Sequence, residues 1–181
     1  MKYQFVANIY RVIFGVVLRI ISNTSCIKCK VIQPTLFLGK GSINVDKKTI
    51  FGVIKSPDFF SYGYVEARSS NSKIEIFGNV VVSNKCKFIA DSATISIHDG
   101  SVIGGNCTIL TSDFHKVGDS NYIKCSDVTI KENVFIGSDV TILKGVVVGK
   151  GSVIANGCLV TKNVPEQVIF AGNPGRVVKK I

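Results

Sequence analysis

A repeat with a period of six residues fills residues 130–164 and restricts the fold more than any other feature. An aliphatic side chain recurs without a gap at six positions: Ile130, Ile136, Ile142, Val148, Ile154 and Val160. Four residues after each comes a second small or apolar side chain: Val134, Val140, Val146, Ser152, Cys158 and Val164. Such a short fixed period predicts a solenoid, in which each unit supplies one short strand and one tight turn.

The same pattern continues towards the N-terminus with less regularity. The aliphatic position recurs in two earlier runs, at Ile76, Val82 and Phe88 and then at Ile97, Ile103 and Ile109. Between the runs the register slips, because Ile95 and Ile97 are both expected to face inward. Before residue 70 we expect only irregular coils. The predicted division is therefore an N-terminal apolar and basic helix with lead-in strands in residues 1–50, a β-solenoid 51–165 with an inserted loop 111–129, and a C-terminal tail 166–181.

Composition supports many short strands and narrows the choice of partners. Hydrophobic residues make up 46% of the chain, which also has 17 glycines. The net charge of +10 favours an anionic partner such as a phosphorylated cofactor or an acidic membrane surface. Nucleic acid fits least, since aromatic residues do not interleave with the basic ones, and we expect none. Cys26 and Cys29 lack the second ligand pair of a structural zinc site, so we expect reduced cysteines in a reducing, cytoplasmic setting.

The segment Phe5–Ile21 is predicted to be a helix with a broad apolar face. Its sequence is FVANIYRVIFGVVLRII, which is short and doubly charged for a membrane span. The non-apolar side chains fall on one stripe: Asn8, Arg11, Gly15, Arg19 and Ser22. Two alternatives follow. Either the helix packs on the protein or on another subunit, or residues 1–30 make peripheral membrane contact with the arginines towards the headgroups, and the two can be combined.

The repeat is interrupted between Ile109 and Ile130, and this insertion is the first candidate for a functional site. Loops that leave a rigid solenoid often carry function. The insertion contains His115, one of two histidines, whose imidazole suits a general base near neutral pH. Asp113 lies two residues earlier and is a candidate for orienting the ring, or is simply a loop residue. The other histidine, His98, sits in a turn and is the weaker candidate.

Two segments carry a resemblance to a known family. ISIHDGSVIGGNCTILTSDFH, and the stretch from VFIGSDV to AGNPGRVVKKI, are similar to maltose and galactoside O-acetyltransferases and to related capsule and O-antigen acetyltransferases. The similarity covers roughly residues 75–181 and implies an all-β, left-handed parallel β-helix that forms a homotrimer with sites between subunits. It further implies that His115 deprotonates the acceptor hydroxyl, which then attacks the thioester of acetyl-CoA. Asn84 aligns with an asparagine that approaches the reacting groups.

The same resemblance implies a cofactor groove. The implied contacts to acetyl-CoA are Ser138, Asn156, Thr161, Lys162, Arg176 and Lys179. Asn156 and Lys179 depart from the family, which often has alanine or glycine at the first position and arginine at the second. Lysine and arginine side chains near the chain end are suited to pairing with the phosphates of CoA.

The resulting hypothesis is an acetyltransferase that moves an acetyl group from acetyl-CoA to a sugar hydroxyl, for a surface polysaccharide or its precursor. One alternative is a different acceptor, such as serine, an amino sugar or a xenobiotic. Another is a non-enzymatic solenoid or membrane-associated module. We expect no metal, because the zinc enzymes with this fold need three histidines and the chain has two. The expected location is the cytoplasm or the inner face of its membrane.

Overall fold

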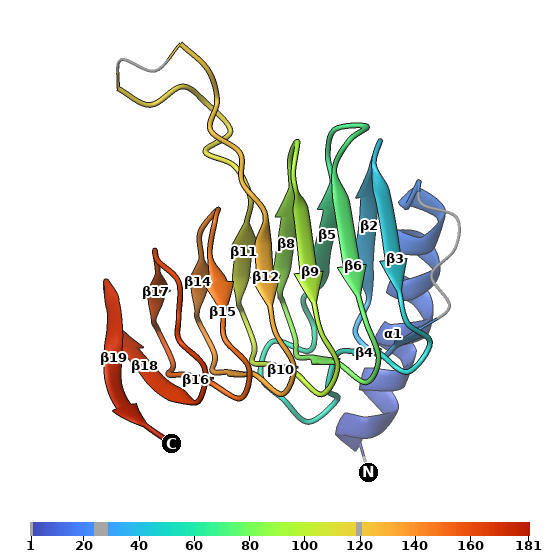
Figure 1. Ribbon diagram of the computed structural model, residues 1–181. Coiled ribbons are helices and arrows are strands. Elements are labelled where there is room, and N and C mark those ends of the chain that lie inside the picture. The colour runs from blue at the N-terminus through green and yellow to red at the C-terminus, as the bar shows by residue number, and fades with distance from the viewer. Residues whose placement is uncertain (1, 24–28, 119–120) are drawn as a thin grey trace.

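The computed structural model describes residues 2–23, 29–118 and 121–181 and contains one helix and three largely parallel sheets in these ranges (Figure 1). The helix α1 spans Lys2–Ile21. Sheet A contains β1 (Lys30–Val31), β4 (Ile50–Phe51), β7 (Val81–Val82), β10 (Val102–Ile103), β13 (Phe135–Ile136), β16 (Val153–Ile154), β18 (Val168–Gly172) and β19 (Gly175–Lys180). Sheet B contains β2 (Thr35–Gly39), β5 (Gly63–Ala67), β8 (Lys87–Ala90), β11 (Thr108–Leu110), β14 (Thr141–Ile142) and β17 (Leu159–Val160). Sheet C contains β3 (Ser42–Val45), β6 (Lys73–Ile76), β9 (Thr94–Ile97), β12 (Val128–Ile130) and β15 (Val147–Val148).

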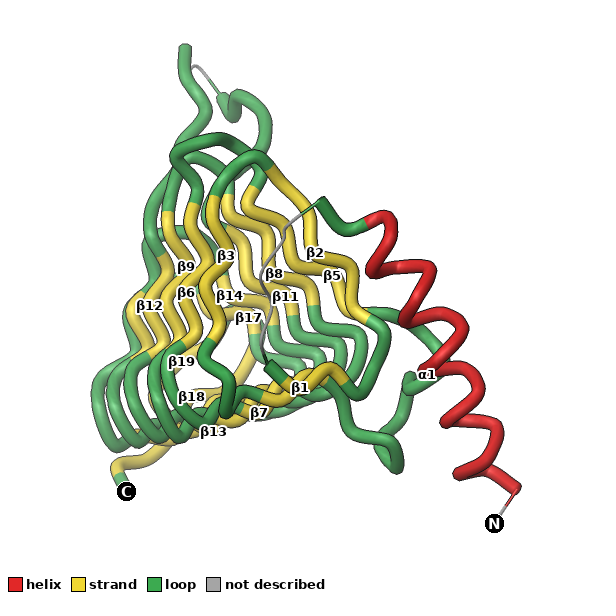
Figure 2. Tube along the Cα trace, turned by 90° about the vertical axis from the view of Figure 1, so that its right-hand side faces the viewer, coloured by secondary structure: helices red, strands yellow, loops and turns green. Residues whose placement is uncertain are grey.

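The chain visits sheets A, B and C in turn and therefore winds into a three-sided solenoid (Figure 2). Phe135 pairs with Val153, and Thr129 pairs with Val147, so one regular coil is 18 residues long, or three units of six. We call the three edges the AB, BC and CA corners, after the sheets they join. In the coil that starts at β13, these corners are residues 137–140, 143–146 and 149–152.

The interior confirms both columns of the predicted repeat. The six aliphatic side chains from Ile130 to Val160 are at most 1% exposed, and the second set from Val134 to Val164 is at most 3% exposed. Ile95 and Ile97 are both fully buried, as the expected register slip requires, because β9 is four residues long and turns alternate side chains inward. Ser152 takes the place of an apolar residue because its hydroxyl donates to the carbonyl of Pro165 over 2.6 Å.

The boundaries differ from the sequence division in two places. Coil pairing already begins at β1, where Lys30 pairs with Ile50, so the solenoid starts some twenty residues before residue 51. The early coils were expected to be irregular but could not be bounded, because their longer strands and loops do not keep the six-residue period. The tail is not a loose extension, since β19 pairs antiparallel with β18 through a turn that contains the cis peptide Asn173–Pro174.

Helix α1 lies alongside β2 at one end of the solenoid (Figures 1 and 2). Ala7 and Leu18 are buried against the body, and Ser22 Oγ accepts a hydrogen bond from the N–H of Phe37. The hydroxyl of Tyr3 donates to the carbonyl of Ile54, and that of Tyr10 to the carbonyl of Ser61. The helix therefore packs on the protein, as one of the two alternatives expected. The packed side is the one that carries Ala7 and Leu18, so the broad apolar face of the helix stays exposed.

Candidate active site on the inserted arm

The insertion forms an arm that projects from the BC corner between β11 and β12, and its described residues are 111–118 and 121–127 (Figure 1). Ser112 and Cys125 form an antiparallel bridge at its base. The N–H of Ser126 donates to the carbonyl of Thr111 over 2.9 Å, and the N–H of Asp113 to that of Lys124 over 3.2 Å. These contacts hold the two ends of the arm together, so it leaves and rejoins the solenoid within one coil, between β11 and β12.

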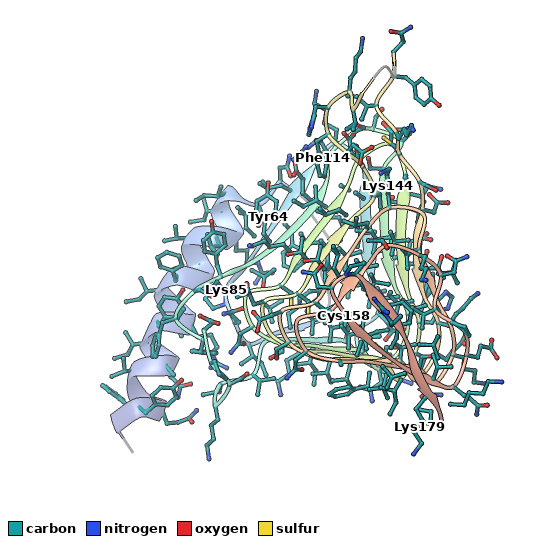
Figure 3. All side chains as sticks on the ribbon, turned by 90° about the vertical axis from the view of Figure 1, so that its left-hand side faces the viewer. Tyr64, Lys85, Phe114, Lys144, Cys158 and Lys179 are labelled. Carbon is teal, nitrogen blue, oxygen red and sulfur yellow. The ribbon has the colours of Figure 1, made fainter. Side chains whose placement is uncertain are left out.

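The two residues before His115 are fixed by side chains from different coils. The Nζ atom of Lys144, in the next coil, lies 2.6 Å from Oδ1 of Asp113. The guanidinium of Arg68, two coils earlier, lies 4.6 Å from the ring centroid of Phe114, a cation–π distance. Phe114 has a φ of 60°, in the left-handed region. Figure 3 shows Phe114 and Lys144 beside the base of the arm.

Electrostatics support this arrangement around Phe114. The Nη2 atom of Arg68 lies 2.9 Å from Oε2 of Glu66, and this hydrogen bond raises the pKa of the guanidinium. Arg68 therefore stays charged beside the aromatic ring. The amide N–H of Phe114 donates to Ser112 Oγ over 2.9 Å, which stabilises the unusual backbone angle. The backbone that carries His115 is thus held on two sides.

His115 itself is exposed, and within the described residues its imidazole makes no hydrogen bond or ion pair. The Asp113 carboxylate, proposed as an orienting group, is instead bound by Lys144 and anchors the arm. A groove of about 690 Å³ lies beside the returning half of the arm, lined by Asp91, Tyr122, Lys124 and Lys144 among others. His115 is not part of this lining, and its side chain is exposed to solvent.

Asn84, the other predicted catalytic residue, lies in a different place and is fully buried at the AB corner. Its Oδ1 accepts from the N–H of Val53, and its Nδ2 donates to the carbonyls of Val53, Ser56 and Pro57 at 2.8–3.2 Å. Every polar position of the amide is used in holding this loop. The role of Asn84 in the structure is therefore that of a clamp, and contact with reacting groups remains a prediction from the resemblance.

The residues predicted to bind acetyl-CoA divide into groups along the solenoid. Ser138 and Asn156 lie at the AB corner, where the N–H of Ser138 donates to Asn156 Oδ1 over 2.9 Å. Arg176 pairs with Ala171 at the same end of sheet A. Small residues border this corner, and a Cβ atom on Gly137 would come within 2.2 Å of Asn156 Oδ1. The absence of a side chain there leaves room for Asn156 of the next coil to pack against this corner.

The remaining predicted contacts lie elsewhere. Thr161 and Lys162 follow β17 at the BC corner, the same corner from which the arm leaves, and both are exposed. Lys179 pairs with Ile169 farther along sheet A, on the side away from the arm (Figure 3). The second histidine, His98, is at the CA corner, where its ring stacks on Phe77 at 5.2 Å and its Nδ1 lies 3.7 Å from Oε1 of Glu132.

Sequence reasoning missed Arg68, Phe114 and Lys144, which fix the arm. Phe114 carried one usable signal, because it directly precedes His115. Arg68 and Lys144 carried none, since they are 47 residues before and 29 residues after His115 in a chain rich in scattered basic side chains.

Comparison with known proteins reveals a consistent set of relatives. Residues 127–162 match the family described as bacterial transferase hexapeptide (six repeats). The galactoside O-acetyltransferase of Escherichia coli K12 is 35% identical over 131 residues, which is 71% of this chain and 60% of that protein. The structural neighbours include the polySia-specific acetyltransferase NeuO, with a TM-score of 0.64, 26% identity, and coverage of 83% of this chain and 63% of that one.

A galactoside acetyltransferase solved with coenzyme A is a further neighbour, with a TM-score of 0.55 and 30% identity. The alignment covers 81% of this chain and 64% of that one. The acetyltransferase neighbours are left-handed β-helices, which confirms the predicted fold class and its handedness. This chain spans only about 60% of the length of the curated galactoside O-acetyltransferase that it matches.

Proposed function

The chain belongs to the hexapeptide-repeat family, and from this premise we propose that it transfers an acetyl group from acetyl-CoA to a sugar hydroxyl, with His115 as general base. The observation that carries the proposal is the arm. It presents an exposed imidazole immediately after two residues, Asp113 and Phe114, that are fixed by Lys144 and Arg68. A general base needs both access to the acceptor and a defined position.

The proposed reaction follows ordinary acyl-transfer chemistry. The imidazole of His115 accepts the proton of the acceptor hydroxyl while the oxygen attacks the thioester carbonyl. The tetrahedral intermediate then expels the sulfur of CoA, which takes the proton back from the imidazolium. An acetyl ester and free CoA are the products. The basic side chains of Lys162, Arg176 and Lys179 are suited to pairing with the cofactor's phosphates.

The geometry of the single chain supports an oligomeric site. His115 extends from the BC corner, whereas Ser138, Asn156 and Arg176 lie at the AB corner, and the strands of sheet B separate the two corners. Reacting atoms must approach to about 3–3.5 Å. We therefore propose a homotrimer in which the arm of one subunit meets the AB corner of its neighbour.

The proposed acceptor is a surface polysaccharide or its lipid-linked precursor. Two relatives support a sugar acceptor, since their names specify a galactoside and polySia. The apolar and basic first thirty residues suit an acceptor at the inner face of the cytoplasmic membrane, where acetyl-CoA is available. An acceptor panel of sugars, amino sugars, serine and xenobiotics, assayed by release of the CoA thiol, identifies the class.

The decisive test compares the two histidines. His115→Ala is expected to lower kcat/KM by about 10²–10⁴-fold, the usual contribution of a general base. His98→Ala is the matched control, because it removes the same side chain from the CA corner, and its activity is expected to stay within about twofold of the wild type. Both variants should keep the wild-type oligomeric mass and circular dichroism spectrum. Equal activities of the two variants would exclude His115 as the base.

A further inference from the structure

The most unusual surface of the molecule is the outer side of α1. Large apolar side chains cover the side that faces away from the solenoid, with exposures from 44% to 78%: Phe5, Val6, Ile9, Val12, Ile13, Val16, Val17 and Ile20. At 100° per residue, these eight positions fall on one continuous face of the helix, opposite Ala7 and Leu18. Soluble proteins rarely expose a contiguous apolar patch of this kind without a partner.

The helix is held in this orientation by specific contacts. Tyr3 and Tyr10 donate hydrogen bonds to carbonyls of the loop 52–62, and their rings pack edge-on against Phe60. At the other end, Ser22 Oγ bonds the N–H of Phe37, and the side chain of Asn23 bonds both backbone groups of Gly39. These contacts use one side of α1 only, so the docked helix necessarily turns its apolar side outwards.

Positive charge accompanies this surface. Residues 1–45 contain six lysines and arginines and no aspartate or glutamate, so they carry six of the ten net positive charges. Arg11 and Arg19 line a crevice of about 510 Å³ between α1 and the first coil, and neither pairs with a carboxylate in the described ranges. Arg19 borders the apolar face, and Arg11 lies on the opposite, crevice side of the helix. An apolar face on one side and unpaired cations on the other is the pattern of a helix that lies in the interface of an anionic membrane.

We propose that α1 lies flat in the surface of an anionic bilayer, with its exposed apolar side chains among the acyl chains and Arg11 and Arg19 at the headgroup phosphates. Phe60, which is half-exposed and packs against Tyr3 and Tyr10 of α1, adds an aromatic side chain beside this surface. An interfacial aromatic side chain suits this depth. The proposal does not depend on the acetyltransferase activity.

Two other occupants fit the observations less well. By length and composition alone, Tyr3–Ile21 is long enough to cross a membrane. Crossing would break the hydrogen bonds of both tyrosines and bury Arg11 near the centre of the span, which is costly. A second copy of the chain would bring a second acid-free segment with six positive charges against the first. A bilayer surface needs no complementary shape and supplies negative charge.

Flotation with preformed vesicles tests the proposal on the full chain. The vesicles contain phosphatidylcholine alone or with about one third phosphatidylglycerol, whose negative charge attracts basic segments. Wild-type protein is expected to float with the anionic vesicles and to bind the neutral ones at least about tenfold more weakly. The variant Ile13→Asp/Ile20→Asp places two charges on the outer face, away from every contact with the body, and is expected to lose binding by about tenfold per substitution.

Matched variants separate this role from general surface effects. Phe135→Asp/Val178→Asp makes the same change at two exposed apolar side chains far along the solenoid and is expected to float like the wild type. Arg11→Gln/Arg19→Gln is expected to weaken binding to anionic vesicles while leaving the weak binding to neutral ones unchanged. Retained flotation of Ile13→Asp/Ile20→Asp would overturn the proposal, as would wild-type protein that fails to float.

Two further measurements exclude the other occupants. A change in oligomeric mass by light scattering for Ile13→Asp/Ile20→Asp, together with no flotation of the wild type, would assign the face to a second copy and overturn the proposal. An N-terminal tag that external protease cannot reach in sealed, cytoplasm-side-out membrane vesicles would indicate a span and also overturn it. Cleavage of the tag, with an unchanged oligomeric mass for the variant, is the expected result.

Discussion

The clamp role of Asn84 gives the sharpest prediction from the structure. Asn84→Ala removes a buried amide that accepts from the N–H of Val53 and donates to three carbonyls of the loop 53–57. Its two N–H donors and one oxygen acceptor amount to about three net hydrogen bonds, each worth about 1 kcal/mol. The loop groups left without partners and the small void raise the expected loss of unfolding free energy to about 3–4 kcal/mol.

For a chain of this size, each kcal/mol shifts the thermal midpoint by about 2–4 °C, so Asn84→Ala is expected to lower Tm by roughly 10 °C. Thermal unfolding followed by circular dichroism measures this shift. Amide hydrogen exchange should also quicken in residues 53–59 and in α1, because the clamped loop holds Tyr3 and Tyr10. Asn79→Ala is the matched control: Asn79 is exposed and its side chain makes no hydrogen bond in the described ranges, so its effect should stay below about 0.5 kcal/mol.

The result that would refute this reasoning is an unchanged Tm for Asn84→Ala. If the variant kept its stability and lost acetyl transfer at temperatures far below Tm, Asn84 would act on the reacting groups instead of on the loop.

Three further predictions concern the arm, the cofactor and a cysteine. Lys144→Met removes the ion pair with Asp113, which is worth about 1 kcal/mol. The amide hydrogens of the arm should then exchange faster and the KM for the acceptor should rise several-fold, while Tm stays nearly constant. An unchanged KM would argue against a positioned arm. Lys162→Ala and Arg176→Ala should each weaken CoA binding, measured by calorimetry, by about tenfold, and by less at high salt. Lys47 is exposed elsewhere on the surface, so Lys47→Ala is the control and should leave the affinity unchanged. Equal affinities for all three variants would remove Lys162 and Arg176 from the cofactor site. Burial raises the pKa of the Cys29 thiol to about 11, so its alkylation in the folded protein should keep accelerating up to that pH, whereas in urea it should level off near about 8.5. Because folding raises the pKa of this thiol, the stability linked to its protonated form is fully present below the pKa of the unfolded chain and is lost as the pH rises towards 11. Peptide mapping by mass spectrometry reads the rates, and a plateau near the unfolded value in the folded protein would contradict the burial.

The interior of the solenoid was the part most accessible to sequence reasoning. Each inward position from Ile130 to Val160 repeats every six residues, and the structure buries all of them. The early coils were less accessible, because β2 and β5 are five-residue strands joined to neighbours by loops such as 52–62 that hide the period. The N-terminal helix was predicted from its pattern. The direction of its apolar face was not, because that depends on tyrosine contacts to a loop some fifty residues away.

In the candidate site, too, one part was predictable from the sequence and another part was not. His115 stood out in sequence because the repeat breaks around it. Its surroundings depend on side chains that meet only when coils stack, as Arg68 and Phe114 do. The resemblance gave Asn84 a catalytic task, whereas the hydrogen bonds of its amide serve the fold.

The closure of the arm at its own base has an evolutionary consequence. Since Thr111 and Ser126 are joined by a backbone hydrogen bond, everything between them can lengthen, shorten or change without disturbing the registry of the coils above and below. In the enzyme proposed above, acceptor preference can then diverge through changes in this one short protrusion, while the AB corner proposed to bind the acyl donor is inherited intact.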